Sequence, residues 1–257
     1  GGDPEKGRDS AEESREEIYE AIKDSDMVFI AAGMGGGTGT GAAPIVAEIA
    51  KESDALTIAV VTKPFGFEGS RRRKLADEGI ARLKEKVDTI IIIPNDRLFS
   101  ICDEKVTMEN AFKMADDVLR QGVQSIAELV TVPGEVNLDF ADVRTVMSNA
   151  GPAWMAIGRG TGENKAVDAA RAAVSSSLLD VSIDGAKGIL FNITGGTDLS
   201  LMEVQAAADI IRSATDPDAN MFFGMVTDLK MEDEVKITII ATGFSSEESF
   251  IPKDEHI

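Results

Sequence analysis

The residues Gly35 to Gly41 read Gly-Gly-Gly-Thr-Gly-Thr-Gly and constrain this chain more than any other stretch. Before them, the apolar run 27–32 predicts a strand buried on both faces, and after them residues 42–52 keep their aliphatic side chains at helical spacing. Glycine allows positive φ and a close approach to a ligand, and the first N–H groups of a helix are free to bind an anion. The order of strand, glycine loop and helix therefore predicts a phosphate-binding cradle.

Other glycine motifs fit this stretch poorly. A Walker-type loop requires Gly-Lys-Ser/Thr, whereas the first lysine after the glycines is Lys51. A dinucleotide fingerprint is met only at Gly37, Gly39 and Ala42, and residues 61–63, which end the next strand, supply no acid for a ribose hydroxyl. A glycine-rich turn that binds no ligand is the remaining structural alternative.

Composition narrows the class of protein further. The 257 residues exceed the usual size of one domain, so one large or two smaller cores are expected. A net charge of −19 disfavours nonspecific binding to nucleic acid and anionic membranes, and the basic cluster 71–74 is too short to reverse this. With Cys102 and His256 as the only residues of their types, disulfides, cysteine metal sites, zinc chemistry and histidine triads are excluded. Without a signal peptide or a long apolar span in the sequence, we expect a cytoplasmic protein.

The first half of the chain alternates strands and helices. Residues 10–23 predict a surface helix that begins with a capping box of Ser10 and Glu13. Strands are predicted at 27–32, 56–62 and 90–93, and helices at 42–52 and 70–86. Such alternation produces a parallel α/β sheet whose ligands bind at the carboxyl ends of the strands. The glycine loop and the segments 63–68 and 94–96 all follow strands and should converge at that rim.

The second half begins with one long helix. Apolar side chains recur at steps of three and four from Thr107 to Val130, and this predicts an uninterrupted helix between two domains. The remainder predicts a second domain with its own sheet. Its predicted helices are 140–147, 165–176 with Asn164 as the cap, and 200–213, and its strands are 154–158, 188–194, 221–226 and 235–242.

Several separate motifs resemble one family. GGGTGTG is the signature of the tubulin/FtsZ family of GTPases, and the surrounding MVFIAAGMGGGTGTGAAP closely resembles its bacterial cell-division members. The motifs FEGSRRR, PND, AFKMADD and NLDFAD extend the resemblance to Phe244. It implies an α/β fold with a parallel-sheet GTP-binding domain, a long central helix and a smaller α+β domain with a mixed sheet. The expected ranges are 1–130 for the GTP-binding domain, 107–130 for its helix, 131–139 for a catalytic loop, 140–244 for the C-terminal domain, and 245–257 for the start of a disordered linker.

The same resemblance implies the site residues. The expected GTP-binding residues are Gly1, Gly2, Asp3, Gly35, Gly36, Gly37, Thr38, Gly39, Thr40, Glu68, Arg72, Asn95, Phe112, Asp116 and Asp117. The expected catalytic residues are Asn137, Asp139 and Asp142, on a loop that enters the nucleotide site of the neighbouring subunit. The implied ligands are GTP and GDP with Mg²⁺ on the nucleotide, and no metal site built by the protein itself is expected.

The chemistry of these residue types agrees with the roles, although each has a simpler explanation. A carboxylate that accepts from N1–H and the exocyclic amine selects guanine over adenine, and a phenyl ring offers a stacking face, as Asp117 and Phe112 would. Without the family, Phe112 is a core residue, Asp116 and Asp117 lie on a solvated helix face, and Asp139 caps the helix that begins at Phe140. Asp116 also stands where the family often has an amide.

The sequence thus predicts a self-assembling GTPase of bacterial cell division that forms head-to-tail filaments and acts at the division site. The alternative is a noncatalytic tubulin-like module that caps filaments, and an oxidoreductase is disfavoured by the missing ribose acid. About 60 residues of the family's GTPase domain are expected before Gly1, and a tail that binds regulators and membrane anchors is expected after Ile257. Without the preceding strands, the sheet should expose an edge at which Phe29 is incompletely covered.

Overall fold

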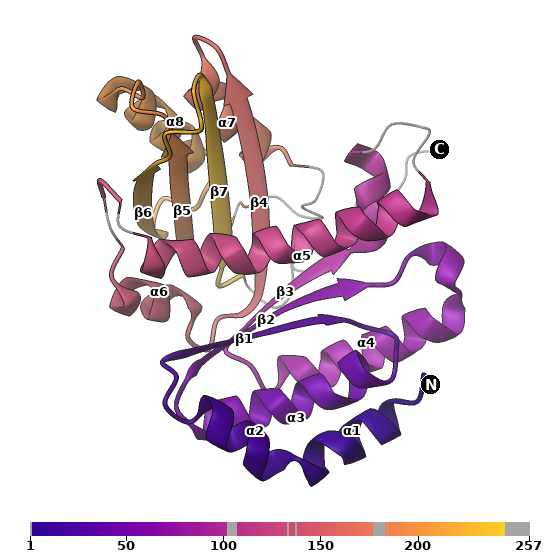
Figure 1. Cartoon of the computed structure of the whole chain (residues 1–257). Helices are drawn as coiled ribbons and strands as arrows, with labels where there is room; N and C mark the ends of the chain where they lie inside the picture. Colours follow the sequence, from indigo (N-terminus) through magenta and orange to yellow (C-terminus); the bar gives the residue numbers. More distant parts are fainter. Residues whose placement is uncertain are drawn as a thin grey trace. The chain divides into compact units, whose positions relative to one another are not determined.

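The computed structural model describes residues 2–101, 107–132, 134–136, 138–176, 183 and 185–244. The chain divides into two compact units. The first comprises Gly1–Gln124 and Met147–Pro152, and the second Ser125–Val146 and Ala153–Ile257. Each unit has its own sheet and its own helices (Figure 1).

The sheet of the first unit is parallel and lies behind the glycine loop. Its strands, in spatial order, are β1 (Met27–Gly33), β2 (Leu56–Lys63) and β3 (Thr89–Pro94). Four helices lie on one side of this sheet (Figure 1), namely α1 (Pro4–Glu13), α2 (Arg15–Ile22), α3 (Thr38–Glu52) and α4 (Ser70–Lys84). Two short 3₁₀ helices, η1 (Gly66–Glu68) and η2 (Asn95–Ile101), follow the carboxyl ends of β2 and β3. The predicted alternation of strands and helices is therefore confirmed.

Burial explains why these strands form where they do. Every residue of β2 from Leu56 to Thr62 is buried, as its unbroken apolar sequence predicts for a central strand. In the edge strand β1, Val28 and Ile30 pack into the core with α3 and α4. Phe29 points to the other face and is only half-buried, as expected for a strand at the edge of the sheet.

Three features of the helices differ from the sequence prediction. The single helix predicted at 10–23 is interrupted at Ser14, where α1 ends and α2 begins. The capping box at Ser10 is wrong, because Ser10 lies inside α1, whose N-cap is Asp3. The Asp3 carboxylate accepts the Glu5 N–H at 3.1 Å, and a proline at the first helical position favours this earlier start. The helix after the glycine loop begins at Thr38 instead of residue 42, so the glycine run itself supplies its first turn.

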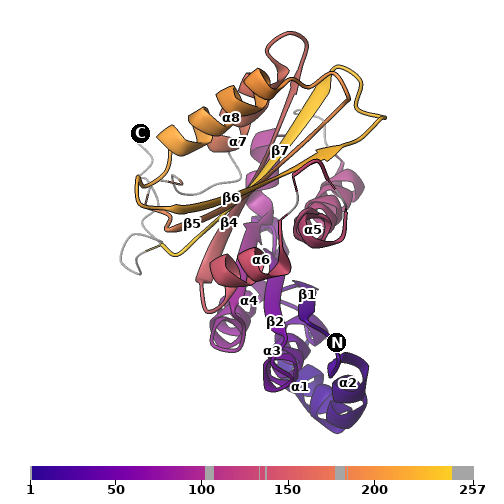
Figure 2. The same cartoon turned by 90° about the vertical axis from the view of Figure 1, so that its left-hand side faces the viewer.

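The sheet of the second unit is mixed, as predicted. In spatial order its strands are β4 (Gly151–Thr161), β7 (Glu234–Thr242), β5 (Gly188–Gly195) and β6 (Asn220–Thr227). β7 is antiparallel to β4 and β5, whereas β6 is parallel to β5. Helices α7 (Lys165–Val174) and α8 (Leu201–Ser213) lie on one face of this sheet (Figure 2). Helix α5 (Met108–Thr131) runs from the first unit into the second, and α6 (Phe140–Met147) follows it.

The two faces of the second sheet differ in chemistry. On the face that packs against α7 and α8, aliphatic and aromatic side chains such as Ile189 and Phe191 form the core. The opposite face carries buried polar residues, namely Asn192, Thr194, Thr238 and Thr242. The end of α5 lies over this polar face, because Glu128 approaches Lys236 of β7 at 3.8 Å.

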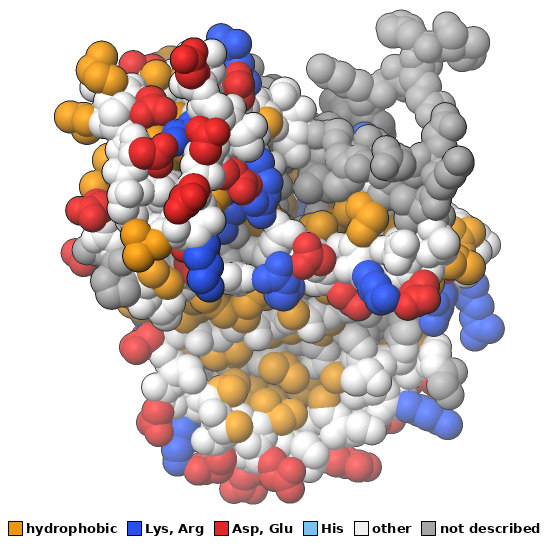
Figure 3. Space-filling model, turned by 45° about the horizontal axis from the view of Figure 1, so that its top comes forward, with side chains coloured by type: hydrophobic (Ala, Val, Ile, Leu, Met, Phe, Trp, Pro, Cys, Tyr) orange, Lys and Arg blue, Asp and Glu red, His pale blue; other side chains and the backbone are white. Residues whose placement is uncertain are grey.

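The surface reflects the acidic composition. Acidic side chains gather along the lower edge of the view in Figure 3, where α1 and α2 lie in Figure 1. Among the described residues, no helix combines the length and the apolar character that a membrane span requires.

Candidate nucleotide-binding and catalytic sites

The glycine loop is bonded to itself and to the sheet. Met34 N–H donates to the Thr62 carbonyl at 3.0 Å, and Gly35 N–H donates to the Thr40 hydroxyl at 2.8 Å. The first intrahelical bond of α3 joins Gly41 N to Gly37 O at 2.9 Å, so the N–H groups of residues 38–40 precede the helical ladder. Three free N–H groups at a helix start, where the dipole is positive, form a site for an anion.

Three glycines of this loop, Gly35, Gly37 and Gly39, allow contacts that a side chain would prevent. Gly35 has φ +99°, and a β-carbon there would lie 2.8 Å from the Arg72 carbonyl oxygen. At Gly39 a β-carbon would lie 2.4 Å from the Gly33 carbonyl oxygen, and at Gly37 it would lie 3.0 Å from that of Asp3. At Gly36, by contrast, no heavy atom lies within 4 Å of the added carbon. The loop is therefore packed from behind and open at Gly36.

Thr40 lies in the predicted loop with its side chain turned inward. Its side chain is buried, with the residue 2 % exposed, and its hydroxyl accepts from Gly35. Thr40 therefore holds the loop through its side chain, and only its N–H points to the helix start. Thr38 is exposed at the first position of α3.

The second rim loop is held by two carboxylates. The Glu68 carboxylate accepts the Phe65 N–H at 2.9 Å and forms an ion pair with Arg72, one turn further on. The Asp96 carboxylate accepts the Gly66 N–H at 2.7 Å and pairs with Arg73 at 3.0 Å. Asp96 thus links the loop after β3 to both the loop after β2 and helix α4. The sequence analysis predicted that residues 63–68 and 94–96 converge at this rim, but it assigned no contact to Asp96, because the register that places Gly66 opposite is not visible in the sequence.

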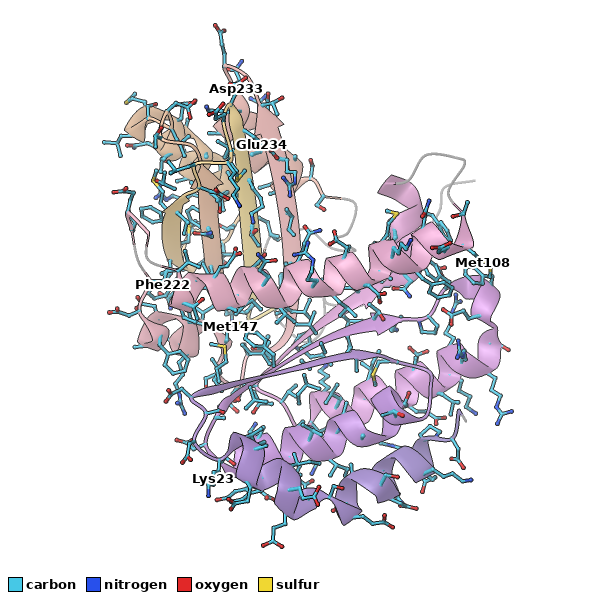
Figure 4. The ribbon with its side chains drawn as sticks, in the orientation of Figure 1. Lys23, Met108, Met147, Phe222, Asp233 and Glu234 are labelled. Carbon is cyan, nitrogen blue, oxygen red and sulfur yellow. The ribbon has the colours of Figure 1, made fainter. Side chains whose placement is uncertain are left out.

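An aromatic cluster occupies the same rim. The buried Phe65 stacks on Phe67 at 5.1 Å and meets the edge of Phe112 at 5.5 Å between ring centroids. Phe112 is 41 % exposed, and Phe99 completes the cluster at 5.1 Å from Phe65. Met108, at the first turn of α5, is also exposed (Figure 4). The structure therefore places Phe112 next to the loop that contains Glu68. The sequence analysis assigned no base contact to Phe65 or Phe67, the aromatic residues of this loop.

The polar residues predicted to bind the guanine base differ in burial and in hydrogen bonding. Asn95 is 5 % exposed, and its side-chain oxygen has no partner among the residues that the structure describes. Asp117 is exposed, and its carboxylate accepts from Arg120 at 2.7 Å and from Gln121 within the same helix. Asp116 is exposed and lies one turn after Phe112 on α5. Binding of a base by Asp117 requires exchange of its present partners.

Two cavities lie beside the start of the chain. Each has a volume of about 420 Å³, and both are lined in part by Gly2 and Asp3. One also reaches Gly37 and Thr38, and the other reaches Thr40 and helix α4. Gly1 lies outside the described residues. Gly2 and Asp3 are therefore next to the phosphate end of the candidate site.

The candidate catalytic loop belongs to the second unit. Asp139 precedes α6, is exposed, and its carboxylate bonds to no residue that the structure describes. Asp139 stands at the predicted cap position before Phe140, but the side-chain bond is made by the other residue, because the Asp142 carboxylate accepts the Asp139 N–H at 3.3 Å. Asn137 lies outside the described residues. The Asp139 carboxylate is thus unpaired as far as the described residues go, while the Asp142 carboxylate is bonded to the start of α6.

The loop is attached to the edge strand β6 by one bridge. Met225 N–H donates to the Val136 carbonyl at 3.0 Å, and Val136 N–H donates back at 3.4 Å. Gly134 permits this approach, because a β-carbon there would lie 2.1 Å from the Met225 carbonyl oxygen. Sequence reasoning missed this attachment, since Gly134 and Met225 are far apart in the chain.

Family models match both halves of the chain. A model of the GTPase domain of the tubulin/FtsZ family matches residues 1–103, and one of the C-terminal domain of the FtsZ family matches residues 151–245. An empty FtsZ dimer from M. jannaschii is 48 % identical, with a TM-score of 0.91, and the match covers 95 % of this chain and 71 % of that one. The chain therefore belongs to the tubulin/FtsZ family, and the predicted fold class is confirmed.

Two further solved structures are similar to this chain. A mutant of the same M. jannaschii FtsZ has the same identity and TM-score and is covered to 73 %. CetZ2 from Haloferax volcanii, described as a GTPγS-bound protofilament, is 21 % identical with a TM-score of 0.76, and the match covers 97 % of this chain and 76 % of that one. At that identity the likeness shows the fold alone. Because the FtsZ structures named here are archaeal, a bacterial origin stays a prediction.

Proposed function

We propose that this chain is a GTPase of bacterial cell division that assembles head to tail into filaments in the cytoplasm and hydrolyses GTP at the contact between subunits. The observation that carries the proposal is the rim of the first unit. There a glycine loop with free N–H groups lies near an exposed aromatic cluster at the carboxyl ends of parallel strands. The chain's membership of the tubulin/FtsZ family supports the same function.

The nucleotide would bind along this rim. Its phosphates would take the N–H groups of residues 38–40 and the open space at Gly36, with Gly2 and Asp3 beside them. Glu68 and Arg72 would contact the ribose side. The guanine would stack on the exposed ring of Phe112, which is next to the Glu68 loop. Mg²⁺ would be held mainly by the phosphates. Among the described residues, no three His, Cys, Asp or Glu side chains are grouped so that they could hold a metal ion.

Base specificity follows from hydrogen bonding. Asn95 has a buried, unpartnered side-chain oxygen, and a donor on guanine would satisfy it. Asp117, after exchange of its bonds with Arg120 and Gln121, would accept from N1–H and the exocyclic amine. Adenine presents a lone pair instead of N1–H, and an unpaired buried polar group costs about 1–3 kcal/mol. In a displacement assay on the full gene product, GTP should therefore outcompete ATP at least tenfold; equal competition would contradict the assignment.

The candidate catalytic carboxylates follow the C-terminal end of α5, whereas the candidate base-binding residues are at its start. Phe112 and Asp117 are in the first turns of α5, and Asp139 follows its last residue, Thr131. At 1.5 Å per residue, the helix from Asp117 to Thr131 alone is about 20 Å long. A group that activates a water must be within hydrogen-bond reach of it, so Asp139 and Asp142 would serve the nucleotide of a neighbouring subunit. Such a heterologous contact propagates as a filament.

Complementation tests hydrolysis between subunits. Asp142→Ala should bind GTP with unchanged affinity and fail to hydrolyse it, and Gly37→Asp should fail to bind it. A mixture of the two should regain part of the activity, because the mixed contact joins an intact nucleotide site to an intact catalytic loop. Turnover should also rise more steeply than linearly with protein concentration. Full activity in a strictly monomeric preparation would refute the proposal, and assembly without any turnover would favour the noncatalytic capping module.

A further inference from the structure

Gly79 is a glycine inside a helix, and the proposed nucleotide chemistry does not use it. It lies in the interior of α4 and is buried. Glycine is among the least favourable residues in a helix interior, because it loses the most conformational freedom on folding. Gly79 is not among the glycines with positive φ, so its backbone conformation would accept any residue. The reason for a glycine at this position must therefore be the space around it.

The first turn of α3 occupies that space. Helices α3 and α4 pack side by side on the sheet of the first unit (Figure 1). A β-carbon added at Gly79 would lie 2.4 Å from Thr40 Cγ2, 2.9 Å from Met34 Cε and 3.3 Å from the Thr40 carbonyl oxygen. Met34 Cε is the end of a flexible side chain and can move aside, whereas Thr40 is buried and β-branched. The methyl group of Thr40 therefore lies directly against the backbone of Gly79.

The same threonine side chain holds the glycine loop. The Gly35 N–H donates to Thr40 Oγ1 at 2.8 Å, so this bond joins the two ends of the segment that contains residues 36–39. Oγ1 and Cγ2 are attached to one β-carbon and occupy adjacent staggered positions. The rotamer that places the methyl group on Gly79 therefore also fixes the direction of the oxygen that accepts from Gly35.

Helix α4 contacts the other end of this hydrogen bond as well. A β-carbon at Gly35 would lie 2.8 Å from the Arg72 carbonyl oxygen. Arg72 precedes Gly79 by about two helical turns, so both face the glycine loop from the same side of α4. One face of α4 thus packs against both partners of the bond between Gly35 and Thr40.

We propose that Gly79 is a positioning residue for the phosphate end of the nucleotide site. The absence of a side chain at Gly79 leaves room for the Thr40 methyl group, and this keeps the Thr40 hydroxyl on the Gly35 N–H. The loop then keeps the shape in which the N–H groups of residues 38–40 are available to an anion. This inference deepens the proposed function and rests on it. Gly79 itself would not touch the nucleotide.

A pair of substitutions tests the contact. Gly79→Ala places a methyl group where Thr40 Cγ2 lies. A cavity lined by both residues gives the displaced threonine side chain room, so the variant should fold. Thr40→Ser removes only that methyl group and keeps the hydroxyl, so the double variant should tolerate the alanine. Thr40→Val keeps the methyl group on Gly79 and removes the acceptor.

The matched control is Thr57→Val. Thr57 is also a fully buried threonine of the first unit, and its hydroxyl donates to the Ala55 carbonyl at 3.0 Å. It lies near the start of β2, whereas the glycine loop is bonded to Thr62 near the end of that strand. Thr57→Val therefore removes a buried hydroxyl bond without altering the loop.

Three quantities are measured on each variant of the full gene product: GTP affinity by titration, turnover at saturating GTP, and hydrogen exchange at the Gly35 amide. In Gly79→Ala, GTP affinity should fall at least tenfold and Gly35 exchange should accelerate at least tenfold, with turnover at saturating GTP within twofold of the parent. Thr40→Val should change affinity and exchange in the same direction. The double variant should match Thr40→Ser within twofold, and Thr57→Val should match the parent within twofold.

Other outcomes overturn the proposal. An equal loss of affinity on adding Gly79→Ala to the parent and to Thr40→Ser would show that the Thr40 methyl group does not transmit the effect. Lower affinity without faster Gly35 exchange would show that the loop bond is not involved, and unchanged affinity in Gly79→Ala would show that Gly79 has no role. A fall in turnover at unchanged affinity would show only a loss of folded protein.

Two further results remain decisive. If Gly79→Ala does not fold, Thr40→Val carries the test, and unchanged GTP affinity in that variant would overturn the proposal. A parent protein that binds no GTP would refute the proposed function, and Gly35 exchange in the parent and in Gly79→Ala would then still decide whether Gly79 maintains the loop bond.

Discussion

The glycine loop of the first unit and the candidate catalytic loop of the second are held in opposite ways. The glycine loop is surrounded by main chain, so that a single added carbon at Gly39 would lie 2.4 Å from the Gly33 carbonyl oxygen. The catalytic loop is attached to an edge strand by the two hydrogen bonds between Val136 and Met225. The first arrangement resists movement, because packed main chain cannot yield without deforming the sheet. We expect the second to shift more easily than the first, because hydrogen bonds to an edge strand can open locally.

This difference fits the tasks proposed for the two loops. A phosphate cradle works through N–H groups that already point at the ligand, so rigidity favours it. A loop that is proposed to act on a neighbouring subunit's nucleotide must adapt to a partner, and attachment to an edge strand allows this. Substitutions in the glycine loop should therefore impair binding and stability together, whereas substitutions in the catalytic loop should impair turnover alone.

The largest expected effect is that of Gly39→Ala. The added methyl group would clash with the Gly33 carbonyl oxygen and displace the first turn of α3, which carries the free N–H groups. Overpacking of this kind costs about 1–3 kcal/mol of stability. GTP affinity should fall about 100-fold or more, measured by titration, with a lower Tm. Gly36→Ala is the control: it meets open space, so its Tm should equal that of the parent. Unchanged GTP affinity in Gly39→Ala would show that the loop is softer than its packing indicates.

The matching change in the other loop is Gly134→Ala. Its methyl group would lie 2.1 Å from the Met225 carbonyl oxygen and should break the bridge to β6. Since the nucleotide residues are untouched, we expect GTP affinity within twofold of the parent and turnover lower by about tenfold or more, which corresponds to about 1.4 kcal/mol in the activation free energy. Glu135→Ala, at the exposed neighbouring position, should keep full turnover. Loss of GTP binding in Gly134→Ala would contradict the separation of the two loops.

The sequence predicted individual strands and helices, but not the contacts between segments that are far apart in the chain. The buried strand β2 and the long helix α5 follow from apolar runs and periodicity, and both formed as predicted within one or two residues. The candidate loops followed from glycine chemistry and from the family resemblance. The start of α1 was missed, because Asp3 and Pro4 form a cap that the capping-box pattern at Ser10 obscured.

The attachments of the loops could not be predicted in this way. Asp96 bonds to Gly66, and Gly134 packs against Met225, each across more than 20 residues of chain. Such pairs depend on strand order and register, which periodicity does not specify. The predicted roles of the site residues accordingly stay predictions, and the variants test them one by one.

A smaller effect should come from Asp96→Ala. This change removes the hydrogen bond from Gly66 N–H and the ion pair with Arg73. The loop that carries Phe65 and Phe67 is then released from Asp96, while the glycine loop is untouched. GTP affinity should fall about tenfold, equivalent to about 1.4 kcal/mol, with turnover at saturating GTP unchanged. The control is Asp77→Ala, which removes only an exposed ion pair with Lys63 and should have almost no effect. A lower turnover at saturating GTP would show that Asp96 does more than hold the base side of the rim.

The smallest expected effect concerns the ion pairs of α3, the helix that follows the glycine loop. Glu48 of α3 accepts from Lys86 at 2.7 Å and from Arg15 of α2 at 2.8 Å. These hydrogen bonds, first that of Lys86 and then that of Arg15, lower the pKa of the Glu48 carboxyl below its usual 4.5. A carboxyl whose pKa is lower in the folded state stabilises the fold above its unfolded pKa, and the stabilisation disappears as the pH falls through the folded pKa.

Glu48→Gln should therefore lower the free energy of unfolding by about 0.5–1 kcal/mol at pH 7, since the pair is partly exposed and screened by solvent. The difference from the parent should shrink below about pH 4.5 and vanish once Glu48 is protonated in the folded parent. Urea unfolding of both proteins at several pH values measures it. A difference that persists at low pH would assign the effect to packing rather than charge. GTP affinity should stay unchanged throughout, because main-chain contacts, and not this ion pair, hold the glycine loop in place.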